Sequence, residues 1–522
     1  MVAVSWCKAP ETFEGSILSH RRCHRRLFLR TILVDMYFRA DTLLIHSFIL
    51  MSSGISIGCG TGVGVRTLSE YALGHQKFST SRLTASLLAS LASGSCFFLL
   101  VEQTYTDGLF VLGAFLLMPV SLCVSGTLAP RMRRFLECFS VAEAVGNIYG
   151  AHVQVLSAIG HVFVQTTRIA MQFSVIARVL EYALSAPHAR VALTAIILTV
   201  VYSSFQGART TTTTGLIQLI AFGVILPAVA LEMWYATGSK HDVKGLWSFH
   251  PNFDFKAVFS GKHASWQAAN LMTLCVLPLF CSPEVFQRMA MARDVQQAKR
   301  VLCYTSLLLM GLFMLMAWMG ILMLADHPNL LPEEIVMYLV KHHLSTGLQG
   351  LLCVGVLALA MSTSETLLNT CSVLCANDIV KPAYRQRLGS AAAARAFSCL
   401  LGGLALIISL EQKSLLEAVI TIGRYYLPVF PMPFVLAVMG FRTTTRVVLA
   451  GMLAGFISMM LWSHVYDPST SLIPGLLTHL TVLFGAHYLL GEPGGWVGVR
   501  QVLPPPRRKR FSASDIHPSE LK

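Results

Sequence analysis

Two adjacent hydroxyl residues, Ser362 and Thr363, lie in the middle of a long apolar stretch, between Ala358 and Glu365. Polar side chains inside a membrane-length apolar stretch are costly, and they are therefore candidates for function. Hydroxyl and carbonyl oxygens can replace the water shell of a small alkali cation. The alternative is structural, because serine and threonine in such a helix also bond to their own backbone or permit close packing. The pattern alone leaves both interpretations open.

A second candidate stretch, residues 89–95, reads Ala-Ser-Leu-Ala-Ser-Gly-Ser. Small residues around Gly94, in the middle of an apolar run, allow a helix to break. A broken helix offers free backbone carbonyls to a cation and free amide groups to an anionic solute. Close packing of two helices is the alternative interpretation of the same small residues.

Arg424 lies near the middle of the apolar stretch 414–438, where an arginine needs a partner. That partner could be the carboxylate of a solute, held in a bidentate pair. It could instead be Glu365 or Glu102, or the side chain could reach the helix end. The first interpretation gives the hypothesis that the solute is a small carboxylate such as an amino acid. Arg168 and Gln172, in the stretch 153–182, either face the same path or lie at a packed interface.

The composition indicates that these residues lie on membrane-spanning helices. The chain has 522 residues, of which 54% are hydrophobic and 13% charged, and its mean hydropathy is +0.61. A soluble domain is about 25% charged, so the composition excludes a disordered chain and an ordinary soluble enzyme. The net charge of +14 comes from basic residues in short loops, a pattern typical of membrane proteins rather than of a nucleic-acid groove. We therefore expect an all-α integral membrane protein whose surroundings are the lipid bilayer.

A bilayer crossing needs about 20 apolar residues in a helix. The sequence contains about 13 candidate spans, near residues 41–64, 84–105, 108–127, 153–182, 190–206, 211–236, 265–284, 299–325, 346–376, 391–410, 414–438, 446–465 and 471–489. They divide the chain into an N-terminal extension (1–40), a transmembrane domain (41–489) and a basic tail (490–522).

The distribution of basic residues predicts the orientation. Alternate loops are rich in Lys and Arg, and the tail carries Arg507, Arg508, Lys509 and Arg510. Because such loops stay in the cytoplasm, we expect a multi-pass protein of the cell membrane with a cytoplasmic C-terminus. The arginines at positions 21–30 precede the first span on the side predicted to be external, which suggests that Met36 is the natural start. The run Lys341-His342-His343 is interpreted as a solvated loop end.

Four stretches, in this order along the chain, resemble the sodium:solute symporter family, which includes proline, pantothenate and sugar symporters. They are Tyr71-Ala72-Leu73-Gly74; Tyr202 to Arg209, followed by Gln218; Pro283 to Arg288, followed by Gln297 to Arg300; and Ala360-Met361-Ser362-Thr363 through Asn369, Ser372 and Asp378.

The resemblance implies two inverted five-helix repeats, as in the leucine transporter, spanning 84–105 to 211–236 and 265–284 to 414–438. It implies a sodium site between the broken first helix of one repeat and the third helix of the other. The matching carbonyl ligands are Ala89, Ala92 and Leu359, and the matching hydroxyl ligands are Ser362 and Thr363. The candidate solute-binding residues are Ser93, Gly94, Glu365 and Arg424.

The chain departs from the family pattern at two carboxylates. Leu91 stands where some members have Asp in the broken helix, and Gly215 to Gln218 lack the Asp of a "T-D-x-x-Q" pattern. Cys275 and Leu279 stand where proline symporters carry aromatic residues, so proline recognition of that type is not expected.

These residues predict a cation-coupled symporter, with sodium as the expected ion, that imports a small organic solute by alternating access. Proton coupling is an alternative because of the absent carboxylates. A transport-inactive membrane sensor or scaffold of the same fold is another. A membrane enzyme is not expected, because no His/Asp or Ser/His group converges in the sequence. No cofactor beyond the coupling ion and no nucleic-acid partner are predicted, and the oligomeric state is left open.

Overall fold

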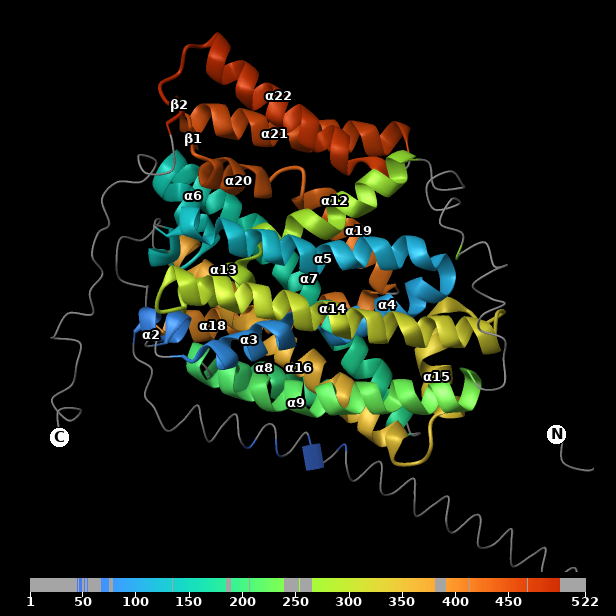
Figure 1. Ribbon diagram of the computed structural model, residues 1–522. Coiled ribbons are helices and arrows are strands. Elements are labelled where there is room, and N and C mark those ends of the chain that lie inside the picture. The colour runs from blue at the N-terminus through green and yellow to red at the C-terminus, as the bar shows by residue number, and fades with distance from the viewer. Residues whose placement is uncertain are drawn as a thin grey trace, which may run out of the picture.

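The computed structural model describes residues 67–74, 78–133, 135–184, 189–205, 207–238, 265–380, 391–412, 414–466 and 468–497, and the isolated positions 45, 47, 48, 51, 54 and 253. Nearly all of the described chain is helical (Figure 1). The α-helices are α2 (Leu68–Leu73), α3 (Thr80–Leu91), α4 (Gly94–Asp107), α5 (Leu109–Leu128), α6 (Val141–Tyr149), α7 (Ala151–Leu184), α8 (Ala189–Phe205), α9 (Ala208–Met233), α12 (Ser265–Cys281), α13 (Pro283–Ala290), α14 (Val295–Asp326), α15 (Ile335–His343), α16 (Leu348–Leu374), α18 (Ala391–Glu411), α19 (Leu415–Tyr426), α20 (Pro431–Met439), α21 (Thr445–Val465) and α22 (Leu472–Leu489).

Short elements connect these helices. The 3-10 turns are η1 (Ala129–Met132), η2 (Phe135–Glu137), η5 (Pro332–Glu334) and η7 (Pro468–Thr470), and π-helical turns η3 (Trp234–Gly238) and η6 (Cys375–Val380) extend α9 and α16. The strands β1 (Phe441–Arg442) and β2 (Gly495–Trp496) pair antiparallel, with Phe441 opposite Trp496. This pairing fixes the start of the predicted tail against the connection between α20 and α21.

The predicted spans from residue 84 onward coincide with helices or with pairs of helices. By length and apolar content, 7 helices among the described residues can cross a membrane, or up to 9 if each bent pair is one span. The number thirteen and the inverted repeats therefore stay predictions. The span at 41–64, the extension 1–40 with Met36, and the basic end of the tail fall outside the described residues, apart from a few isolated positions.

The expected break in the first repeat is confirmed. Helix α3 ends at Leu91 and α4 begins at Gly94, with an angle of 54° between them. Ala92 leaves the helical conformation with φ −77° and ψ 61°, and the Ser93 side chain caps α4 by accepting a hydrogen bond from the amide of Cys96. A Cβ added at Gly94 would lie 3.0 Å from Ala360 Cβ, so the glycine also permits close packing against α16.

A second break lies in the stretch 414–438, which was predicted as one continuous span. Helices α19 and α20 meet at an angle of 58° across residues 427–430. Pro428 and Pro431 explain the break, because proline lacks the amide donor and its ring clashes with the preceding turn. The sequence therefore contained a signal for this break in its prolines.

Helix α16 lies at the centre of the bundle and is buried along almost its whole length. Helices α21 and α22 pack together at one side of the molecule (Figure 1). Their outer faces expose large apolar side chains, among them Leu453, Leu461, Leu477 and Leu489. Such exposed apolar faces on long helices fit a lipid environment, and they would be unfavourable in water.

Candidate functional site

The cation-site prediction centres on the end of α3. The Thr363 hydroxyl, on α16, donates to the carbonyl oxygen of Ala89 at 3.3 Å and lies 3.5 Å from that of Ser90. Because α3 ends at Leu91, carbonyl groups of its last turn have no partner farther along the helix. A buried hydroxyl and free carbonyl oxygens therefore face each other, as the sequence predicted.

The Ser362 hydroxyl lies near the same part of α3. A Cβ added at Gly215 of α9 would lie 3.3 Å from Ser362 Oγ, 3.6 Å from Ser86 Cα and 3.8 Å from Ala89 Cβ. Gly215 thus lies where α3, α9 and α16 come together. The donor chemistry, carbonyl and hydroxyl oxygens around a helix break, fits a monovalent cation.

For the other two predicted carbonyl ligands, Ala92 and Leu359, the structure gives less direct evidence. Ala92, at the end of α3, and Leu359, on α16, are both buried. The amide of Ala92 donates to the Leu88 carbonyl, which closes the last turn of α3. Ser90, which was not predicted, instead brings its carbonyl oxygen close to Thr363.

Glu365, on α16, faces α8 and α9. Both its carboxylate oxygens accept hydrogen bonds at 2.8 Å, one from the Tyr202 hydroxyl and one from the Thr214 hydroxyl. It is buried and does not line the cavity described below. Its prediction as a solute-binding residue therefore has no geometric support.

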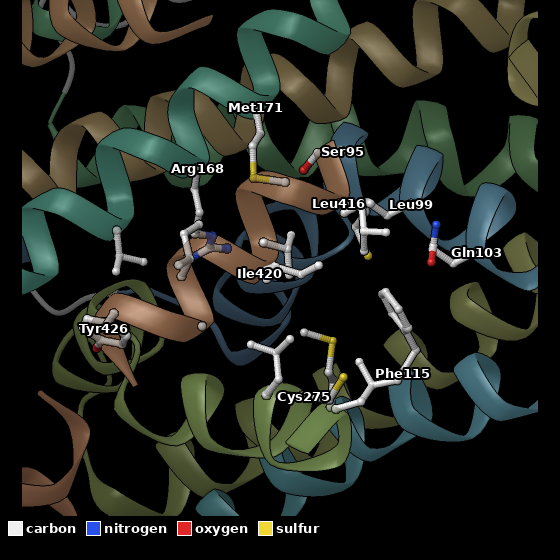
Figure 2. Close-up of a pocket in the computed structure, with 18 of the residues that line it drawn as sticks. Ser95, Leu99, Gln103, Phe115, Arg168, Met171, Cys275, Leu416, Ile420 and Tyr426 are labelled. Carbon is white, nitrogen blue, oxygen red and sulfur yellow. The ribbon is translucent and has the colours of Figure 1, made fainter. Parts of the chain in front are cut away.

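A cavity of about 500 Å³ lies beside the break between α3 and α4 (Figure 2). Ser93 and Ser95 border it at the break, Arg168 and Met171 border it from α7, and Cys275 borders it from α12. The wall reaches the ends of helices at one end of the bundle, where Asp107, Leu416 and Pro468 contribute. Much of the remaining lining is apolar, as in many ligand sites.

Two arginines border the cavity and differ in their partners. Arg168 forms an ion pair with the buried Glu284 of α13, whose other oxygen accepts a hydrogen bond at 2.7 Å from Gln165. Arg424, on α19, donates to Ser463 Oγ at 3.1 Å, and its guanidinium carbon lies 5.6 Å from the Tyr425 ring centroid. Among the described contacts, Arg424 pairs with neither Glu365 nor Glu102. It borders the cavity, and its role in solute binding stays a prediction.

The contacts of Gln172 favour the second of its two interpretations, a position at a packed interface. Its side-chain nitrogen donates to Ser95 Oγ at 2.6 Å, and its oxygen accepts from the Ser95 amide at 3.2 Å. It therefore holds the first turn of α4 at the edge of the cavity. The Arg168–Glu284 pair was not predicted, although both charges fall in or beside apolar stretches where an ionisable residue signals a partner.

Several motif residues hold helices together. Gln287 donates to the Ala72 carbonyl at 2.9 Å and to Asn369 Oδ1 at 3.1 Å. Arg288 is fully buried and donates to Ser86 Oγ at 3.0 Å and to Thr366 Oγ1 at 3.1 Å. Because Ser86 and Thr366 lie one turn from the Ala89 and Thr363 contacts, Arg288 joins the two helices that frame the candidate cation site.

The comparison with solved structures supports the fold. The chain is similar to a Na⁺-coupled sialic acid symporter in a substrate-bound outward-open state, with a TM-score of 0.75 and 16% identity over 88% of this chain and 99% of that one. It is also similar to a nucleobase-cation-symport-1 family transporter in a closed conformation with bromovinylhydantoin bound, with a TM-score of 0.51 and 13% identity over 80% of this chain and 95% of that one. No curated protein matches the sequence.

The family comparison covers most of the chain. The sequence pattern of the sodium:solute symporter family matches residues 71–455, which include all four motif stretches, the broken helix and the Ser362–Thr363 pair. The chain is therefore a multi-pass membrane protein of the transporter class, and it belongs to the sodium:solute symporter family.

Proposed function

We propose that this protein is a sodium-coupled symporter that imports a small carboxylate solute across the cell membrane by alternating access. The observation that carries the proposal is the contact between the Thr363 hydroxyl and the carbonyl oxygens of Ala89 and Ser90 at the broken end of α3. Family membership supports sodium as the coupled ion. The exposed apolar helix faces support a location within a bilayer, where a transporter acts.

Coupling follows from the position of the two candidate sites. The cation site lies at the end of α3, and the cavity begins at Leu91 and Ser93, directly beyond it. A cation held by both α3 and α16 would fix the α3 end and with it the Ser93 edge of the cavity. The ion gradient then drives uptake because each ligand favours the binding of the other, and this coupling is reciprocal.

Thr363→Val tests the cation site, because valine keeps the shape of threonine and removes the hydroxyl. A bond to a charged group is worth about 1.5–3 kcal/mol, so we expect the half-saturating sodium concentration for uptake to rise by about tenfold or more. Ser362→Ala is expected to act in the same direction. Uptake is measured in reconstituted vesicles over a range of sodium concentrations.

Ser364→Ala is the matched control, because the Ser364 hydroxyl is already bonded to the Ala360 carbonyl of its own helix at 2.8 Å. It should leave the sodium dependence unchanged. Equal uptake by the wild-type protein with and without sodium would exclude sodium coupling, and uptake driven by a pH gradient alone would favour the proton-coupled alternative.

The solute class rests on the two arginines of the cavity. Arg168 already has a carboxylate partner in Glu284. The contacts described for the Arg424 guanidinium are with the Ser463 hydroxyl and the Tyr425 ring. A guanidinium that borders a largely apolar cavity is suited to bind a carboxylate in a bidentate pair.

Arg424→Gln is therefore expected to raise the apparent KM for a transported acid by about tenfold or more, by loss of a charge-assisted bond. Arg424→Lys should give an intermediate value, because lysine keeps the charge and loses the planar fork. The transported acid is first identified by a thermal-stabilisation screen of the purified protein with sodium. An unchanged KM for every acid in Arg424→Gln would contradict the carboxylate assignment and leave sodium coupling intact.

A further inference from the structure

Three side chains with metal-binding chemistry lie close together. They belong to the end of the bundle that carries α15, which is labelled in Figure 1. They are Asp326, the last residue of α14; His327, which caps that helix; and His343, the last residue of α15. His343 Nε2 lies 3.4 Å and His327 Nε2 lies 3.6 Å from the same carboxylate oxygen of Asp326. All three ligand atoms lie within 4.8 Å of one another.

The two distances to Asp326 suit a tetrahedral metal ion. Zinc binds imidazole nitrogen at about 2.0–2.1 Å and carboxylate oxygen at about 2.0–2.2 Å, so neighbouring ligand atoms in a tetrahedron lie about 3.3–3.5 Å apart. The two oxygen-to-nitrogen distances nearly match this value. Two histidines and one carboxylate are also a common donor combination for zinc sites that keep a fourth position open.

The surroundings orient two of the three ligands. His343 Nδ1 lies 3.4 Å from Thr237 Oγ1, which directs the opposite nitrogen, Nε2, toward Asp326. Outer contacts of this kind fix the ring and its tautomer in metal sites. The Tyr105 hydroxyl, on α4, donates to the His327 carbonyl at 2.7 Å and accepts from the Leu330 amide at 3.0 Å. This contact holds the backbone of the second histidine.

We propose that Asp326, His327 and His343 form a binding site for a divalent transition metal of the zinc class. The Tyr338 hydroxyl lies 3.2 Å from His327 Nε2. In the metal-bound protein, the ion replaces this hydroxyl as the partner of His327 Nε2. The ion joins the end of α14 to the end of α15. The Tyr105 hydroxyl connects His327 to α4, and α4 contributes Gln103 and Asp107 to the cavity. The site is distinct from the candidate sodium site and does not depend on the transport proposal.

The sequence interpretation of residues 341–343 as a solvated loop end is therefore revised for His343 alone. His343 is mostly enclosed, whereas His342 stacks on Tyr338 with ring centroids 4.3 Å apart and is not one of the three clustered residues. The adjacent histidines thus offer a matched pair, one inside the proposed site and one beside it.

The test uses the full-length protein, purified without a polyhistidine tag and titrated with Zn²⁺ alone. Binding is measured by calorimetry and by the rise in thermal unfolding temperature, which mass action requires when an ion binds the folded state. We expect one saturable site in the wild-type protein. His343→Gln and Asp326→Asn should each weaken it by at least about tenfold, since even outer-contact losses cost 10- to 100-fold in affinity. His342→Gln should bind as the wild type does.

Co²⁺ substitution gives a second measurement, because tetrahedral Co²⁺ absorbs strongly in the visible and the band should be lost in His343→Gln. The unfolding temperatures of the variants without metal show whether each one is folded. The proposal is overturned if the wild-type protein shows no saturable Zn²⁺ site, or if His342→Gln loses as much affinity as His343→Gln. In those cases the three side chains form only an ion-paired cluster.

Discussion

At the scale of single residues, the two arginines that border the cavity have different partners, although both lie in apolar stretches of the sequence. Arg168 faces a buried carboxylate, Glu284, that is also bonded by Gln165. Arg424 contacts a hydroxyl and an aromatic ring. Replacement of the two arginines should therefore affect different properties: stability for Arg168 and solute affinity for Arg424.

Arg168→Gln is expected to destabilise the folded protein by about 3 kcal/mol or more, because it leaves the Glu284 charge buried without its cation. The double variant Arg168→Gln/Glu284→Gln should recover most of this loss, since no uncompensated charge remains. Denaturant unfolding in detergent measures both. A single variant as stable as the wild type would contradict the inferred ion pair.

The structure also shows where the residues predicted to bind the ion and the solute lie. Ala89 and Thr363 are in direct contact, and Ser362 lies beside them. Glu365 follows Thr363 by two residues and therefore points to another side of α16, where it meets Tyr202 and Thr214. Spacing along a helix determines which residues share a face, whereas the neighbouring helices determine what that face meets.

At the scale of elements, close helix contacts shape the core around the broken helix. Helix α14 passes α4 at Gly320, where an added Cβ would lie 2.6 Å from the Val101 carbonyl oxygen and 3.2 Å from Thr104 Cβ. Small residues at such crossings let helices approach each other closely in a membrane. The glycine therefore sets the distance between α14 and the second half of the broken span.

Gly320→Ala is expected to cost about 1–3 kcal/mol of stability, because the methyl group forces the two helices apart. Gly311→Ala is the matched control in the same helix, since a Cβ there has no neighbour within 4 Å. It should be neutral or slightly stabilising, given the higher helix propensity of alanine. Thermal unfolding of both variants in the same detergent would reveal the difference, and equal midpoints would argue against the close approach of α4 and α14.

At the scale of the whole molecule, the basic loops and the cavity suggest one orientation. The cavity wall reaches Asp107, Leu416 and Pro468, which lie at connections that are predicted to be external because they carry few cations. The basic connections lie at the opposite ends of the same helices. In the proposed orientation the cavity therefore opens to the outside, which suits the uptake of a solute.

An epitope inserted after Gln412, between α18 and α19, should bind antibody on intact cells expressing the protein. An epitope added at the C-terminus should bind only after the cells are permeabilised, because basic segments stay in the cytoplasm. The two insertions control for each other. Labelling of the C-terminal epitope on intact cells would reverse the proposed orientation.

The membrane class, most of the helices and the family could be predicted from the amino-acid sequence. Long apolar stretches must form helices in lipid to satisfy their backbone groups, and this requirement is local. The break at residues 92–93 and the hydroxyl pair were also predictable, since small residues around a glycine allow a helix to break and buried polar groups are costly in an apolar span.

The identity of the polar groups that meet became visible in the folded molecule. The fold joined Arg168 to Glu284 across 116 positions in sequence and brought Asp326 and His343 together from the ends of two helices. It also turned Glu365 away from Arg424, toward α8 and α9. The packing of whole helices decides which polar groups meet in the low-dielectric interior, and this packing cannot be read from local patterns in a single sequence.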